Sequence, residues 1–84
     1  MRIVFRGTVQ GVGFRPAVYR TAVSMGLNGS VRNDGPEVVV EADRGEEFLE
    51  RFLGNIPPLA HIQSYSTFPS EVRASGFSIE ESSA

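Results

Sequence analysis

One short segment, residues 9–16, constrains the fold most, because it ends a β-type pattern and begins a helical one. Before it, apolar and polar residues alternate, which predicts a strand with one mostly apolar face. Gly11 and Gly13 then permit positive φ values that other residues avoid. Pro16 suits the first turn of a helix, where its missing N–H costs nothing. We therefore predict a strand, a glycine loop and a helix that begins near Arg15.

The same loop has the groups that bind a small oxyanion. Backbone N–H groups in a glycine loop can converge on one point, and a helix N-terminus adds the positive end of its dipole. Arg15 would supply forked donors at the same place, and a cation at a helix start makes most sense with an anion nearby. We interpret the segment as an oxyanion site, most naturally for phosphate. The alternative is that the glycines serve only a tight turn.

Composition limits the classes of protein that fit. The chain has 84 residues, of which 40% are hydrophobic, as expected for one globular domain spanning residues 1–84. It has no cysteine, which excludes a disulfide and a thiolate metal site, and we expect neither a metal nor another cofactor. The apolar runs are too short for a membrane span or a signal peptide, so the predicted location is cytoplasmic.

The net charge of −2 is unevenly distributed along the chain. Residues 1–35 carry five arginines and one acid, whereas residues 36–84 carry three arginines and nine acids. The positive part therefore coincides with the glycine loop. This distribution suits a small anion better than nucleic acid, which the acidic remainder would repel. Phe5 is the only aromatic residue of the expected central strands, which also argues against an RNA-binding sheet.

The remaining patterns predict a β-α-β-β-α-β order with an extra edge strand. Predicted strands cover residues 2–9, 30–33, 37–42, 62–68 and 77–79, and predicted helices cover residues 15–25 and 46–55. Gly26 is expected to end the first helix, and Asp34-Gly35 to form a hairpin turn. The second helix should bury Phe48, Leu49, Phe52 and Leu53, and residues 82–84 should fray.

These elements define an α+β fold, a ferredoxin-like open-faced sandwich. Its sheet is expected to be mostly antiparallel, with both helices on one face and a short C-terminal strand at one edge. Right-handed connections predict that the first and third strands lie side by side at the centre.

Two motifs resemble those of acylphosphatase. They are Gly7-Thr8-Val9-Gln10-Gly11-Val12-Gly13-Phe14-Arg15 and Gly26-Leu27-Asn28-Gly29-Ser30-Val31-Arg32-Asn33-Asp34-Gly35, which lie at the family's spacing. The resemblance implies that the loop amides hold phosphate together with Arg15, and that Asn33 orients the attacking water. The loop residues concerned are Gln10, Gly11, Val12, Gly13 and Phe14. Taken alone, Asn33 is typical of a turn, so its catalytic role rests on the resemblance. Its amide has an oxygen to hold the water and donors to contact the substrate.

The residues at positions 13 and 16, Gly13 and Pro16, differ from those that are usual in the small free-standing acylphosphatases. Three segments are similar instead to the N-terminal acylphosphatase-like domain of the hydrogenase-maturation carbamoyltransferase: residues 13–16, 57–60 and 77–79. This resemblance implies hydrolysis of an acyl phosphate, above all carbamoyl phosphate, by a monomeric domain whose partners are further domains of a larger protein. Two alternatives stay open: a stand-alone acylphosphatase, and a non-catalytic module that binds an anion or docks to other domains.

Overall fold

The computed structural model describes residues 1–81 and confirms the predicted order of elements. The elements are β1 (Arg2–Thr8), α1 (Phe14–Ser24), β2 (Gly29–Asp34), β3 (Glu37–Ala42), α2 (Gly45–Leu53), β4 (His61–Phe68) and β5 (Phe77–Ile79). The ends of β3 and β5 are as predicted, and those of the other elements lie within two residues of the predicted ones. The predicted fraying of residues 82–84 lies outside the described residues. No helix within residues 1–81 has the length and apolar character needed to cross a membrane.

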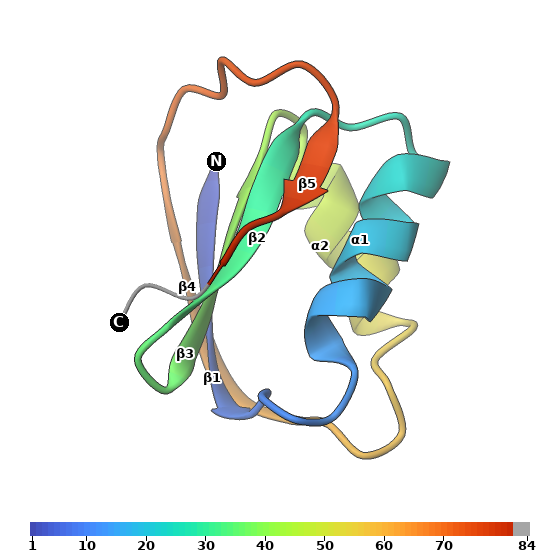
Figure 1. Cartoon of the computed structure of the whole chain (residues 1–84), viewed down its shortest axis with the longest axis vertical. Coiled ribbons are helices and arrows are strands. Elements are labelled where there is room, and N and C mark those ends of the chain that lie inside the picture. The colour runs from blue at the N-terminus through green and yellow to red at the C-terminus, as the bar shows by residue number, and fades with distance from the viewer. Residues whose placement is uncertain (82–84) are drawn as a thin grey trace.

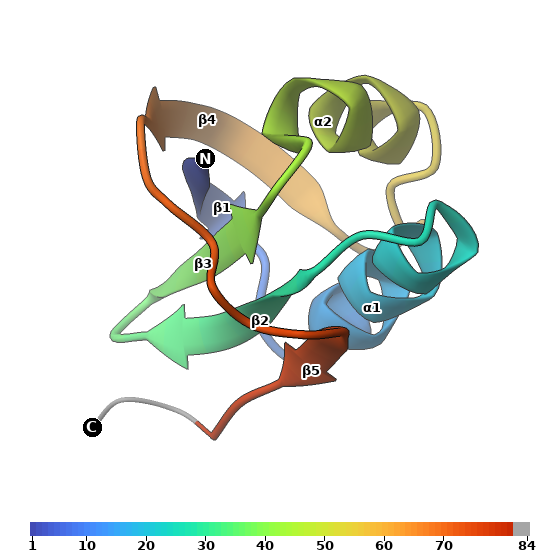
Figure 2. The same cartoon turned by 90° about the horizontal axis from the view of Figure 1, so that it is seen from above.

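The strands form one five-stranded sheet in the order β4-β1-β3-β2-β5. β1 and β3 pair at its centre, as the right-handed connections predicted. The central pairs are antiparallel, and β5 pairs with β2 in parallel at one edge, so the sheet is mixed. Both helices pack on one face, and the described residues leave the other face open (Figures 1 and 2). The predicted open-faced sandwich is confirmed.

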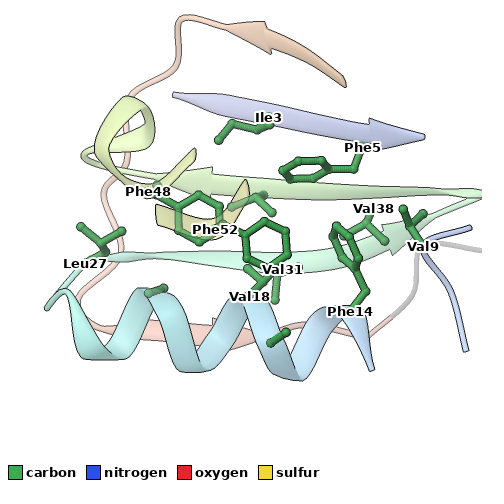
Figure 3. Packing of buried hydrophobic residues seen from close by; sticks show 14 residues of the cluster. Ile3, Phe5, Val9, Phe14, Val18, Leu27, Val31, Val38, Phe48 and Phe52 are labelled. Atoms are coloured by element: carbon green, nitrogen blue, oxygen red, sulfur yellow. The ribbon is translucent and has the colours of Figure 1, made fainter. Parts of the chain in front are cut away.

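The hydrophobic core fills the layer between the sheet and the two helices (Figure 3). The rings of Phe5, Phe14 and Phe52 meet edge to face, with centroids 5.1–5.7 Å apart. Phe48 and Phe52 are the fully buried apolar side chains of α2, because these two residues are one turn apart and share the face toward the sheet. The prediction that Leu53 belongs to the core is wrong, since this side chain is 37% exposed. It follows Phe52 by about 100° around the helix and so points past the sheet.

The end of α1 follows the glycine-based pattern that the sequence predicted. Gly26 has a φ of 68°, and its N–H donates to the carbonyl of Val23 at 3.0 Å. The N–H of Leu27 donates to the carbonyl of Ala22 at 3.0 Å, and the Leu27 side chain is buried. These two bonds define a Schellman motif, which satisfies the last carbonyls of the helix and directs the chain into β2.

The hairpin between β2 and β3 turns one residue later than predicted. Asp34 is the last residue of β2, and Gly35 and Pro36 form the loop. Gly35 has a φ of 59°, whereas proline cannot adopt a positive φ. The geometry therefore fits a type II′ turn, which needs a positive φ only at its first central residue. Pro36 thus fixes which pair of residues forms the turn.

Candidate active site

The loop between β1 and α1 is built around two glycines in the left-handed region. Gly11 has a φ of 72° and Gly13 a φ of 75°, while no other residue type within residues 1–81 has a positive φ. Negative and positive φ values therefore alternate from Gln10 to Gly13, the pattern that turns successive N–H groups toward one point. A Cβ at either glycine would meet no heavy atom within 4 Å, so the requirement is conformational and not one of space.

The backbone N–H groups of residues 10–15 have no acceptor within the described residues. We call residues 10–15 the amide loop. Its two ends are held by the buried side chains of Val9 and Phe14, so the backbone between them lies at the surface. Gly13 is the N-cap of α1 and offers no side chain to bond the first amides. The amide loop therefore presents unpaired donors at the positive end of a helix dipole, as an anion site requires.

Arg15 is the second residue of α1 and is half-buried. Within residues 1–81 its guanidinium makes no ion pair or side-chain hydrogen bond, and no acidic residue lies in the first turn of α1. Two other arginines of residues 1–35 form ion pairs on the open face of the sheet. Arg2 pairs with Glu41 and Arg6 with Glu37, each at 2.7 Å. The cation beside the amide loop is thus left for a ligand.

Asn33 lies in β2, opposite Val38 of β3. It follows the buried Val31 by two residues and therefore faces the helices, as Val31 does. Its Oδ1 is buried and has no hydrogen-bond partner within the described residues. The amide oxygen of Asn33 is therefore withdrawn from solvent.

Two observations bring Asn33 and the amide loop together at one end of the sheet. Val38, the partner of Asn33, also pairs with Phe5 of β1, and the ring of Phe5 contacts that of Phe14 at the start of α1. Figure 3 shows Val38, Phe14 and Val9 gathered at this end. In addition, Nε2 of Gln10 donates to the carbonyl oxygens of Gly35, at 2.6 Å, and Glu37, at 3.3 Å. The amide loop is therefore joined by hydrogen bonds to the hairpin that carries Asn33.

The histidine and a further arginine of α1 lie away from this site. His61 is exposed in β4, and Arg20 lines a hollow of about 380 Å³ between the helices together with Arg51. Within the described residues, His, Asp and Glu side chains form no group of three or more that could hold a metal ion. The sequence predicted a role for the backbone amide of Gln10 but not for its side chain. Its contact with the hairpin has no signature in local sequence.

Comparisons with known proteins identify the family to which the chain belongs. The acylphosphatase family model matches residues 1–79. The chain is 47% identical over 89 residues to carbamoyltransferase HypF2 of Cupriavidus necator, covering 99% of this chain and 11% of that protein. It is 37% identical to an acylphosphatase of Picrophilus torridus, covering 90% of this chain and 95% of that protein. The crystal structure of full-length HypF in its phosphate- and nucleotide-bound form superposes with a TM-score of 0.80 at 32% identity, covering 96% of this chain and 12% of that chain.

The chain belongs to the acylphosphatase family. Its relatives include both stand-alone acylphosphatases and carbamoyltransferases, and it spans about a tenth of the length of the carbamoyltransferases it matches.

Proposed function

We propose that this chain hydrolyses acyl phosphates to a carboxylate and inorganic phosphate. The observation that carries the proposal is the set of unpaired N–H groups in the amide loop, next to the unpaired guanidinium of Arg15 among the described residues. The loop would bind the phosphoryl oxygens, and Arg15 would bind two of them at once while staying charged at any working pH. Asn33, at the same end of the sheet, would orient the attacking water.

Hydrolysis of an acyl phosphate needs few catalytic groups beyond the phosphate-binding amides, Arg15 and Asn33. The oxygen of a water molecule forms a bond to phosphorus, and the bond between phosphorus and the acyl oxygen breaks as the carboxylate leaves with the electron pair. A carboxylate is weakly basic, so its departure needs no strong general acid. Positioning and electrostatic stabilisation can therefore supply most of the acceleration. The proton of the water would pass to a phosphate oxygen or to solvent.

Carbamoyl phosphate is the proposed substrate. The proposal rests on the similarity to carbamoyltransferases, which extends over nearly the whole of this chain. In this reading residues 1–84 form one monomeric, cytoplasmic domain of a hydrogenase-maturation carbamoyltransferase and work beside its further domains. The relative from Picrophilus torridus, which the chain matches over 95% of its length, supports a stand-alone acylphosphatase as the second candidate.

The test is phosphate release from carbamoyl phosphate and acetyl phosphate by the purified chain, with Arg15→Ala as the test variant. Arg20→Ala is the matched control, since Arg20 also lies on α1 but away from the amide loop. We expect Arg15→Ala to abolish turnover and Arg20→Ala to retain it. Unchanged turnover in Arg15→Ala would refute the proposed site. Stabilisation by phosphate without any turnover would favour the non-catalytic anion-binding module.

A further inference from the structure

The side chain of Gln10 connects two parts of the candidate site that are distant in sequence. The Nε2 atom of its amide carries two N–H groups, and these donate to the carbonyl oxygens of Gly35 and Glu37, the residues on either side of Pro36. Those carbonyls belong to Gly35 in the turn and to Glu37 at the start of β3. One side chain of the amide loop therefore holds the tip of the β2–β3 hairpin at two points.

The tip of this hairpin has little other support on its outer side. β5 pairs with β2 only from Gly29 to Val31, so Asn33 lies beyond the last paired residue of that edge. Toward the sheet centre, Asn33 pairs with Val38 of β3. Only the pair Asp34–Glu37 and the turn extend beyond β1 as a two-stranded ribbon, which twists more strongly than the middle of a sheet. The position of Asn33 relative to the amide loop thus depends on β3, whose first residue Glu37 also pairs with Arg6 of β1, and on the contact made by Gln10.

We propose that Gln10 is a positioning residue, which sets the distance between the phosphate-binding amides and Asn33 through its side chain. The inference rests on the proposed function, in which the amide loop binds the phosphoryl group and Asn33 orients the water. Hydrolysis requires both groups to keep their places at once, whereas binding of inorganic phosphate requires only the loop and Arg15. The side chain of Gln10 should therefore affect turnover and not anion affinity.

The test variant is Gln10→Met, which keeps an unbranched side chain of similar length but has no N–H to donate. Gln63→Met is the matched control, because Gln63 is exposed in β4 and its side chain makes no hydrogen bond within residues 1–81. We expect Gln10→Met to lower kcat about tenfold or more, as a displaced catalytic group does. The dissociation constant for inorganic phosphate should stay within about twofold of the unsubstituted chain, a change well below 1.4 kcal/mol.

Hydrogen exchange of the backbone amides of residues 32–38 gives a readout that does not depend on activity. We expect faster exchange there in Gln10→Met than in Gln63→Met, with exchange in β1 unchanged. An unchanged kcat, unchanged exchange in the hairpin, or a loss of phosphate affinity equal to the loss of kcat would each overturn the positioning role. If the unsubstituted chain hydrolyses nothing, the proposed function fails, and the exchange rates alone then decide whether Gln10 holds the hairpin.

Discussion

Replacing Asn33 by valine should make the protein more stable and inactive. Asn33 Oδ1 is buried without a hydrogen-bond partner among the described residues, an arrangement that costs free energy in the folded state. Its strand neighbours on the same face, Val31 and Val38, are fully buried. Valine removes the unpaired oxygen, continues this apolar row and suits a strand. The change therefore relieves a penalty without opening a large cavity.

The size of the effect follows from the state of that one atom. A buried polar group without a partner costs about 1–3 kcal/mol, and Asn33 is only half-buried as a residue, so the lower end applies. We expect Asn33→Val to raise the free energy of unfolding by about 1 kcal/mol. In a domain of this size that corresponds to a rise in Tm of about 4–8 °C. Hydrolysis of acetyl phosphate should fall by about a hundredfold or more, as when a group that acts in the transition state is removed.

Thermal and urea unfolding followed by circular dichroism measure the stability, and phosphate release measures the activity. Asn28→Val is the matched control, because Asn28 is satisfied on both sides: Nδ2 donates to Asp43 at 2.9 Å, and Oδ1 accepts from the N–H of Gly76 at 2.7 Å. It should lower stability by about 1–2 kcal/mol. A lower Tm for Asn33→Val would refute the reasoning about the buried oxygen, and full activity would refute the catalytic role.

Three further outcomes are expected. Arg15→Lys keeps the charge but loses the forked donors, so calorimetry should show phosphate binding weakened about tenfold; equal affinity would exclude two-point binding by Arg15. Phe52→Ala removes a fully buried ring that contacts three other phenylalanines and should cost about 3–5 kcal/mol in urea unfolding, while a loss below about 1 kcal/mol would contradict the described core. Burial alone would raise the pKa of Glu41, but hydrogen bonds from Ser70 and Arg2 outweigh it and lower the pKa. Because the pKa of Glu41 is lowered in the folded state, this carboxylate stabilises the protein above the ordinary pKa of glutamate, and the stabilisation is lost as the pH falls through the lowered pKa. Glu41→Gln should therefore be less stable than the unsubstituted chain at neutral pH, and the difference in the free energy of unfolding should shrink in acid.

The fold could be predicted because its signals are local. Alternation marks β1 and β3, helical spacing marks α1, and Gly26 marks the end of that helix. These signals require no knowledge of distant contacts. The hairpin turn was misplaced by one residue because Asp34-Gly35 is the stronger local signal, whereas the fixed φ of Pro36 decides the geometry. Leu53 was misplaced because apolar spacing at a helix end does not say where the sheet stops.

The candidate site was only partly visible in the sequence. Glycines 11 and 13 predicted the conformation of the amide loop, because positive φ is a local requirement. The contact of Gln10 with Gly35 joins residues 25 positions apart and depends on how β1 and the hairpin meet in space. The buried oxygen of Asn33 likewise depends on packing against other elements. Local sequence carries no information about either feature.

The place of β1 in the sheet has a consequence for biosynthesis. β1 is made first, yet one of its two partners is β4, and Arg2 faces Phe68 in that pairing. A nascent chain that has not reached β4 therefore exposes one edge of β1, with Ile3, Val4 and Phe5 on it. Such an edge can pair with other chains. The pairing of β1 with β4 joins residues far apart in the sequence and therefore forms slowly, so the edge stays exposed for longer. Premature termination between β3 and β4 should thus yield aggregating fragments and not a smaller folded unit.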